Sequence, residues 1–94
     1  MSEEATRQLV ERFVAAFNAG DHEAMLALLS EDVAHDRPDG SREIGREAFR
    51  WYLGMEARSF RESWADLAVM VGDGGGRAAI EFTRREVTPY LDQW

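Results

Sequence analysis

The chain of 94 residues has no cysteine, no lysine and only two prolines. Without cysteine it can form neither a disulfide framework nor a thiolate metal site. All 11 basic residues are arginines, against 18 acidic residues, and the net charge is −7. No stretch gathers the arginines into the basic patch that phosphate contacts require, so we expect no nucleic-acid partner.

Long hydrophobic runs are also missing. No apolar stretch approaches the ~20 residues of a membrane span, and none resembles the core of a signal peptide. We therefore expect a cytoplasmic protein with no membrane partner. The length predicts a single domain over residues 1–94. A domain this short buries only a modest core on its own, so we expect it to have a surface that binds a partner.

The first half of the sequence predicts helices. Ser2, followed by two glutamates, suits a helix start, and the set Leu9, Val10, Phe13, Val14 and Phe17 has the spacing of one buried helix face. Gly20 suits the left-handed end of that helix, and Asp21 suits the cap of a second helix with Met25, Leu28 and Leu29 facing inward. A third helix is predicted over about residues 46–57, where Phe49, Tyr52, Leu53 and Glu56 recur at helical spacing.

Strands are predicted around and after the third helix. Residues 33–36 read as a short strand followed by a turn at 38–40. From residue 62 to 71 the period is two, with apolar residues on both faces, and the glycine run at 72–76 predicts a hairpin connection to an antiparallel strand over 77–83. On this strand Asp66 is either at the sheet edge or a buried functional carboxylate, and we favour the edge.

Two segments carry a family resemblance, VERFVAAFNAGDHEAMLALLSEDVAHDR at 10–37 and GSREIGREAFRWYL at 40–53. Together they resemble the N-terminal half of the nuclear transport factor 2-like superfamily, which includes ketosteroid isomerase and SnoaL-like proteins. The resemblance implies an α+β fold in which three N-terminal helices pack on a curved antiparallel sheet, forming a cone with one ligand pocket. It also implies a protein that binds a small apolar molecule, with isomerase-like or cyclase-like acid-base chemistry as an option.

The C-terminal part departs from the family pattern. Residues 86–94 resemble the family's final strand and exit, as though an intervening hairpin were missing. A natural short form, an engineered deletion and a fragment are all compatible with this departure. Fewer strands than the family would leave unpaired edges, so we expect the chain to form a homodimer.

His35 and Asp36 are the candidate catalytic residues. Adjacent side chains on a strand point to opposite faces, so only one of the two can face a pocket. A histidine there could act as general acid or base near neutral pH, whereas the structural alternative is a histidine that completes its hydrogen bonds at the sheet rim.

Aromatic residues supply the candidate ligand-binding set. They come from separate elements that converge in the family's cone, and they are Phe13, Phe17, Phe49, Tyr52, Trp64 and Phe82. The alternative is that these residues form plain core, in a non-catalytic dimerisation module with a filled cone. An open cavity behind them would favour ligand binding.

Steroid isomerase chemistry is not expected. The position that matches the isomerase's oxyanion tyrosine is Phe13, which has no donor, and the position that matches its base is Arg37. We also expect no metal and no cofactor, because His22 and His35 lack the spacing of a ligand pair.

Overall fold

The computed structural model describes residues 1–59 and 61–87, and within these ranges the fold is α+β, as predicted. The elements are the helices α1 (Glu3–Asn18), α2 (His22–Leu26) and α3 (Arg46–Ser59), and the strands β1 (Ala34–Asp36), β2 (Arg42–Ile44), β3 (Arg61–Gly72) and β4 (Arg77–Val87). The described strands form two antiparallel sheets of two strands each, β1–β2 and β3–β4. Strand β2 was not predicted. Residues 88–94, most of the segment that resembles the family's final strand, lie outside the described ranges.

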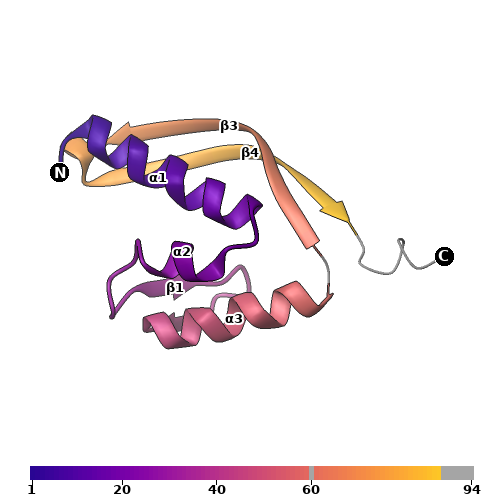
Figure 1. The fold of residues 1–94 in the computed structure, drawn as a ribbon. Helices are drawn as coiled ribbons and strands as arrows, with labels where there is room; N and C mark the ends of the chain where they lie inside the picture. The colour runs from indigo at the N-terminus through magenta and orange to yellow at the C-terminus, as the bar shows by residue number, and fades with distance from the viewer. Residues whose placement is uncertain (60, 88–94) are drawn as a thin grey trace.

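Two layers make up the structure. The long β3–β4 hairpin lies along α1, and α2, β1 and α3 gather on the other side of α1 (Figure 1). The chain passes from the first layer to the second through the short turn between α1 and α2. This arrangement brings the end of α1, the end of α3 and the start of β3 to one side of the molecule.

Local signals in the sequence set the ends of the first two helices. The Ser2 side chain accepts a hydrogen bond from the Ala5 amide at 3.0 Å, and Asp21 Oδ1 accepts one from the Ala24 amide at 3.1 Å. Each bond satisfies a backbone donor that a helix start leaves free. Gly20 has φ +71°, the left-handed conformation that glycine adopts without strain. Both predicted caps and the predicted helix end are therefore confirmed.

The core is centred on α2. Met25 and Leu26 are each 1% exposed, and Leu53 of α3 packs against them. The predicted inward set of α2 included Met25 but omitted Leu26, which is among the most buried residues of the described chain, whereas Leu28 and Leu29 are half-buried. Among the described residues, none of the helices has the length and hydrophobicity needed to cross a membrane.

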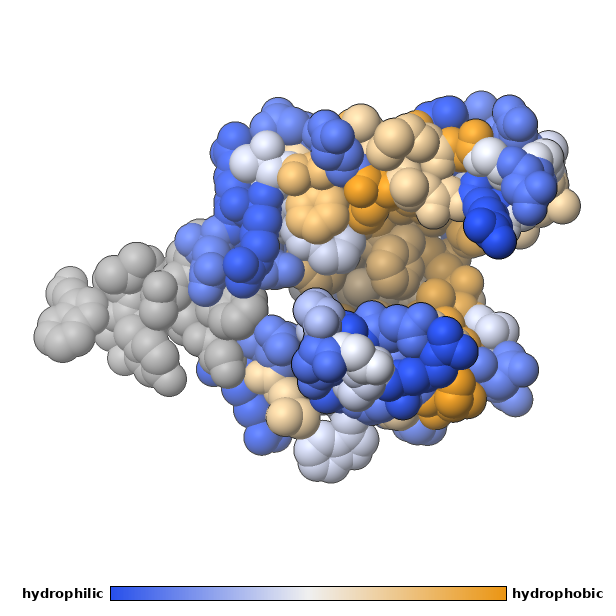
Figure 2. Space-filling view, turned by 180° about the vertical axis from the view of Figure 1, so that it is seen from behind, coloured by the Kyte–Doolittle hydropathy of each residue, from blue (hydrophilic) through white to orange (hydrophobic). Residues whose placement is uncertain are grey.

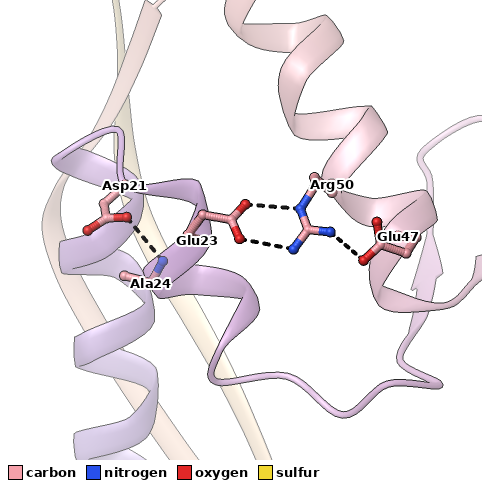
Figure 3. A network of polar contacts seen from close by, with 5 residues as sticks. All are labelled: Asp21, Glu23, Ala24, Glu47 and Arg50. Atoms are coloured by element: carbon pink, nitrogen blue, oxygen red, sulfur yellow. Dashed lines mark hydrogen bonds and ion pairs between the residues drawn. The ribbon is translucent and has the colours of Figure 1, made fainter.

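An arginine of α3 ties this helix to α2 (Figure 3). The Arg50 guanidinium donates from Nε to Glu23 Oε2 at 2.9 Å and from Nη2 to Glu23 Oε1 at 3.0 Å, and it also pairs with Glu47. Such two-point contacts are geometrically specific. The hydrogen bonds from Arg50 hold the pKa of the Glu23 carboxyl below its usual value.

Strand β3 contains a β-bulge. Ala65 pairs with Thr83, but Ala68 pairs with Glu81, so three steps on β3 oppose two on β4. Asp66 lies in the bulge with φ +55°, and its side chain is exposed, as the edge interpretation expected. The extra residue shifts the side-chain alternation by one position, which the predicted strict period of two did not include.

The glycine run forms the hairpin connection, as predicted, through the 3-10 turn η1 (Asp73–Gly75). This turn packs against the start of α1. Thr6 Oγ1 donates a hydrogen bond to the Gly75 carbonyl at 2.6 Å, and both residues are buried. Gly75 has φ +102°, and a Cβ there would overlap the Met1 carbonyl oxygen and lie within 2.8 Å of the Ser2 carbonyl. Glycine is therefore required where the hairpin meets α1.

Candidate functional site

A cavity of about 970 Å³ opens between the two layers. Its walls come from the end of α1, from α2, strand β1, one face of α3 and the start of β3. Seen from behind, the molecule is hollowed between its upper and lower parts, and the floor of the recess is hydrophobic (Figure 2). The volume lies at the upper end of the usual range for small-molecule sites.

Four of the six predicted aromatic residues line this cavity, namely Phe17, Phe49, Tyr52 and Trp64. Phe17 stacks on Trp64 with ring centroids 4.0 Å apart, and Phe82 stacks on Trp64 at 4.5 Å. Phe82 is absent from the cavity lining, so its contribution is to support the Trp64 ring. The stack gives the cavity a rigid aromatic wall.

Phe13 does not join the other aromatic residues at the cavity. It packs against the core and lines a separate apolar pocket of about 190 Å³ together with Leu9, Val10, Leu28 and Leu29. Phe13 and Phe17 are one helical turn apart on α1. The Phe13 ring packs toward α2, whereas the Phe17 ring stacks on Trp64.

The two catalytic candidates on β1 point to different sides, as strand alternation requires. His35 lines the cavity, where its ring meets Phe49 and Tyr52 edge to face at 4.9 and 4.7 Å. Its Nδ1 atom is buried, and no group in the described part of the chain forms a hydrogen bond with it. Asp36 does not line the cavity: its exposed carboxylate forms a two-point ion pair with Arg42, at 2.5 and 2.9 Å, which lowers the pKa of Asp36.

The pKa of the Tyr52 hydroxyl is set chiefly by burial and by two charged neighbours, Glu56 and Arg37. Burial raises the pKa of its hydroxyl, and the nearby Glu56 carboxylate adds to this increase. The Arg37 guanidinium, 4.9 Å from the ring centre, acts in the opposite direction. Arg37 also pairs with Glu43 of β2. The net effect keeps the Tyr52 hydroxyl protonated at neutral pH.

Several polar residues of the lining were not predicted as site residues, including His22, Glu56, Arg61 and Glu62. Glu56 had a sequence signal, because it shares the helical spacing of Phe49, Tyr52 and Leu53 and so places a carboxylate on an apolar face. Glu62 accepts a hydrogen bond from Trp64 Nε1 at 3.1 Å and pairs with Arg84. It therefore fixes the polar edge of the indole.

The SnoaL-like domain family matches residues 10–90 of the sequence. The chain belongs to this family. The SnoaL-like domain is also similar to solved structures of candidate polyketide cyclases. The one from Xanthomonas campestris pv. campestris has a TM-score of 0.88 and 43% identity over 92% of this chain. The one from Pseudomonas putida KT2440 has a TM-score of 0.84 and 45% identity over 92%.

A third structure, from Silicibacter sp. TM1040, has a TM-score of 0.85 and 32% identity over 94% of the SnoaL-like domain. The domain covers 64%, 62% and 64% of these three chains, slightly less than two thirds of their length. A comparison with curated proteins found no match. The likeness places the fold in the nuclear transport factor 2-like class that the sequence resembles.

Proposed function

We propose that this SnoaL-like domain binds a small, mainly apolar molecule that contains rings, and that His35 acts on it as general acid and base in a cyclase-like reaction. The observation that carries the proposal is the position of His35. It lies in the wall of a cavity of about 970 Å³, edge-on to Phe49 and Tyr52, and its Nδ1 has no hydrogen-bond partner within residues 1–59 and 61–87.

The ligand class follows from the wall of the cavity. Phe17, Phe49 and Trp64 present aromatic surface, and the Trp64 ring is held in a stack. Aromatic rings favour flat, apolar partners that stack or meet them edge-on. The solved relatives, described as candidate polyketide cyclases, point to the same class of ring-forming substrate.

The chemistry follows from the pairing of His35 with Tyr52. An imidazole can remove a proton from a carbon next to a carbonyl group, and the resulting enolate can attack a second carbonyl to close a ring. Tyr52 keeps its hydroxyl proton because burial raises its pKa, so it can donate a hydrogen bond to the developing oxyanion. His35 then returns the proton to the product.

Ketosteroid isomerase activity is not part of the proposal. Phe13 has no hydroxyl and lies outside the cavity lining, and Arg37 is paired with Glu43. We expect no isomerisation of an unsaturated ketosteroid above the buffer rate. Turnover well above that rate would contradict this assignment.

The rival function is a dimerisation module whose cone is filled. The open cavity beside Tyr52 and Trp64 favours ligand binding over this rival. A thermal-shift screen against tricyclic and tetracyclic hydroxyquinones tests the choice. A ligand that binds only the folded state at 100 times its Kd stabilises it by about 2.7 kcal/mol. A flat response across the panel would favour the filled module.

The role of His35 is tested by His35→Ala, with Asp36→Asn as the matched control one residue along the strand. We expect His35→Ala to remove turnover of any substrate found in the screen while the far-ultraviolet circular dichroism stays unchanged. Asp36→Asn should keep turnover, because Asp36 lies outside the cavity lining. Equal turnover in wild type and His35→Ala would exclude His35 as the acid-base group.

A further inference from the structure

We propose that the ligand carries a carboxylate group and that Arg61 binds it. The proposal deepens the proposed function and rests on it, because it concerns the same cavity. Arg61 is the first residue of β3 and one of the cavity-lining residues.

The Arg61 guanidinium lies at the turn between α1 and α2. Its Nη2 atom is 3.8 Å from the position that a Cβ on Gly20 would occupy. Asn18, Gly20 and His22 line the cavity at the same turn. A ligand group that reaches this end of the cavity therefore meets a cation together with polar neighbours.

Among the described residues four arginines, Arg12, Arg58, Arg61 and Arg85, have no side-chain ion pair or hydrogen bond, and of these only Arg61 lines the cavity. Five other arginines pair with carboxylates, namely Arg37, Arg42, Arg50, Arg77 and Arg84. Arg7 and Arg46 donate instead to the carbonyls of Val69 and Leu29, at 2.9 and 2.7 Å. Within residues 1–59 and 61–87, Arg61 forms no ion pair or hydrogen bond of either kind, although the chain has 18 acidic residues for 11 arginines. Its planar donor fork is available for a carboxylate of a ligand.

The two glutamates of the cavity lining, Glu56 and Glu62, favour a ligand orientation in which the carboxylate points toward Arg61. The Glu62 carboxylate is engaged by Arg84 and by the Trp64 indole, so it leaves Arg61 unneutralised. Glu56 lies on α3, close enough to Tyr52 to raise the pKa of that hydroxyl. A ligand carboxylate is repelled from Glu56 and attracted to Arg61, which leaves the apolar rings to face Phe49 and Tyr52.

A pair of probes that differ in charge tests the proposal. 2-Naphthoate and 2-naphthamide have nearly the same shape, and their Kd values can be measured by isothermal titration calorimetry at neutral pH and low salt. We expect the wild-type chain to bind the acid about five- to tenfold more tightly than the amide, the range of a partly exposed charge-assisted contact. Arg61→Gln should abolish this preference without changing the Kd of the amide, and Arg61→Lys should keep part of it.

Arg12→Gln is the matched control, since it removes one charge from the exposed surface of α1, away from the cavity lining. It should leave the preference for the acid unchanged. Equal binding of acid and amide by the wild type, or an unchanged preference in Arg61→Gln, would overturn the assignment of Arg61 while leaving the proposed cavity function intact. Failure of both probes to bind the wild type would overturn both proposals.

Discussion

The side chain of Asn18 forms hydrogen bonds to both backbone polar groups of Trp64. Asn18 Nδ2 donates to the Trp64 carbonyl at 3.0 Å, and Asn18 Oδ1 accepts from the Trp64 amide at 2.8 Å. The last residue of α1 thus occupies the place that a neighbouring strand would take beside β3. It protects that edge at the point where the strand supplies an aromatic ring to the cavity.

Asn18→Ala should therefore destabilise the fold and loosen Trp64. The loss of two hydrogen bonds at a partly exposed position is expected to cost about 1–2 kcal/mol of unfolding free energy, measured by urea denaturation. Gln8→Ala, which removes one long exposed contact to Glu4 at 3.3 Å, serves as the control and should cost much less. Equal unfolding free energies for the two variants would contradict the role of Asn18.

The ion pair between Glu23 and Arg50 should make stability depend on pH. The folded pKa of Glu23 is lowered from its ordinary value of 4.5, chiefly by the hydrogen bond from Arg50. The stabilisation is therefore present above about pH 4.5 and is lost as the pH falls through the folded pKa. Glu23→Gln should be less stable than the wild type at pH 7, and the difference should shrink as the pH falls below 4.5.

Urea midpoints of the two proteins at pH 7, 5 and 3 measure this effect. Glu11→Gln, on an exposed position of α1, makes the same change in charge without breaking an ion pair of the described residues. At pH 7 the stability of Glu11→Gln should be close to that of the wild type or slightly higher. The chain carries a net charge of −7, so removal of one negative charge reduces its self-repulsion. A gap between wild type and Glu23→Gln that is constant from pH 7 to pH 3 would rule out the ion pair as its source.

Gly75 and Gly74 form a natural comparison. Both have positive φ values, +102° and +64°, but only Gly75 has backbone of the α1 start where a Cβ would be. Gly74→Ala is expected to cost about 1–2 kcal/mol from backbone strain alone. Gly75→Ala should cost more in the same urea titration and should raise hydrogen exchange at the start of α1. Similar losses of unfolding free energy in the two variants would show that the backbone of η1 and the start of α1 can move apart at little cost.

Self-association remains a prediction. Helix α1 covers one side of the β3–β4 hairpin, and Met70 on β3 is 49% exposed. We expect a dimer at micromolar concentration by light scattering, since among the described strands β4 pairs only with β3, and a strand edge without a partner favours pairing with another chain. Met70→Glu should weaken the dimer, whereas Ala15→Glu on the exposed side of α1 should not. A monomeric wild type with a single cooperative unfolding transition would refute the prediction.

The helices could be predicted because their signals are local. Ser2, Gly20 and Asp21 act on amides a few residues away, so their meaning is visible in the sequence. Strand β2 was missed because three residues, Arg42 to Ile44, carry no periodic pattern, and only pairing with β1 makes them a strand. The bulge at Asp66 was missed for a related reason, since its register is defined by the partner strand.

The candidate site divides in the same way. The sequence placed His35 on the first strand and named four of the aromatic residues that line the cavity, because strand and helix periods indicate which side chains share a face. It included Phe13, whose direction depends on how α1 crosses α2. It missed Arg61, which lines the cavity and has no ion pair within residues 1–59 and 61–87. Neither property is encoded in spacing along the chain.

The bulge in β3 determines which side chains of the two halves of the strand share a face. Ahead of Asp66, Trp64 faces the cavity and the end of α1, and beyond it Val69 is half-buried on the hairpin while Met70 is exposed. Trp64 and Val69 are five residues apart on β3, but their partners Arg84 and Ile80 are four apart on β4, so the bulge puts the two side chains on the same side of the hairpin. In a regular strand an odd spacing would place them on opposite faces. A single insertion elsewhere in β3 that no second bulge absorbs would therefore turn one of these side chains away, whereas deletion of the bulge residue itself would keep both on the same side.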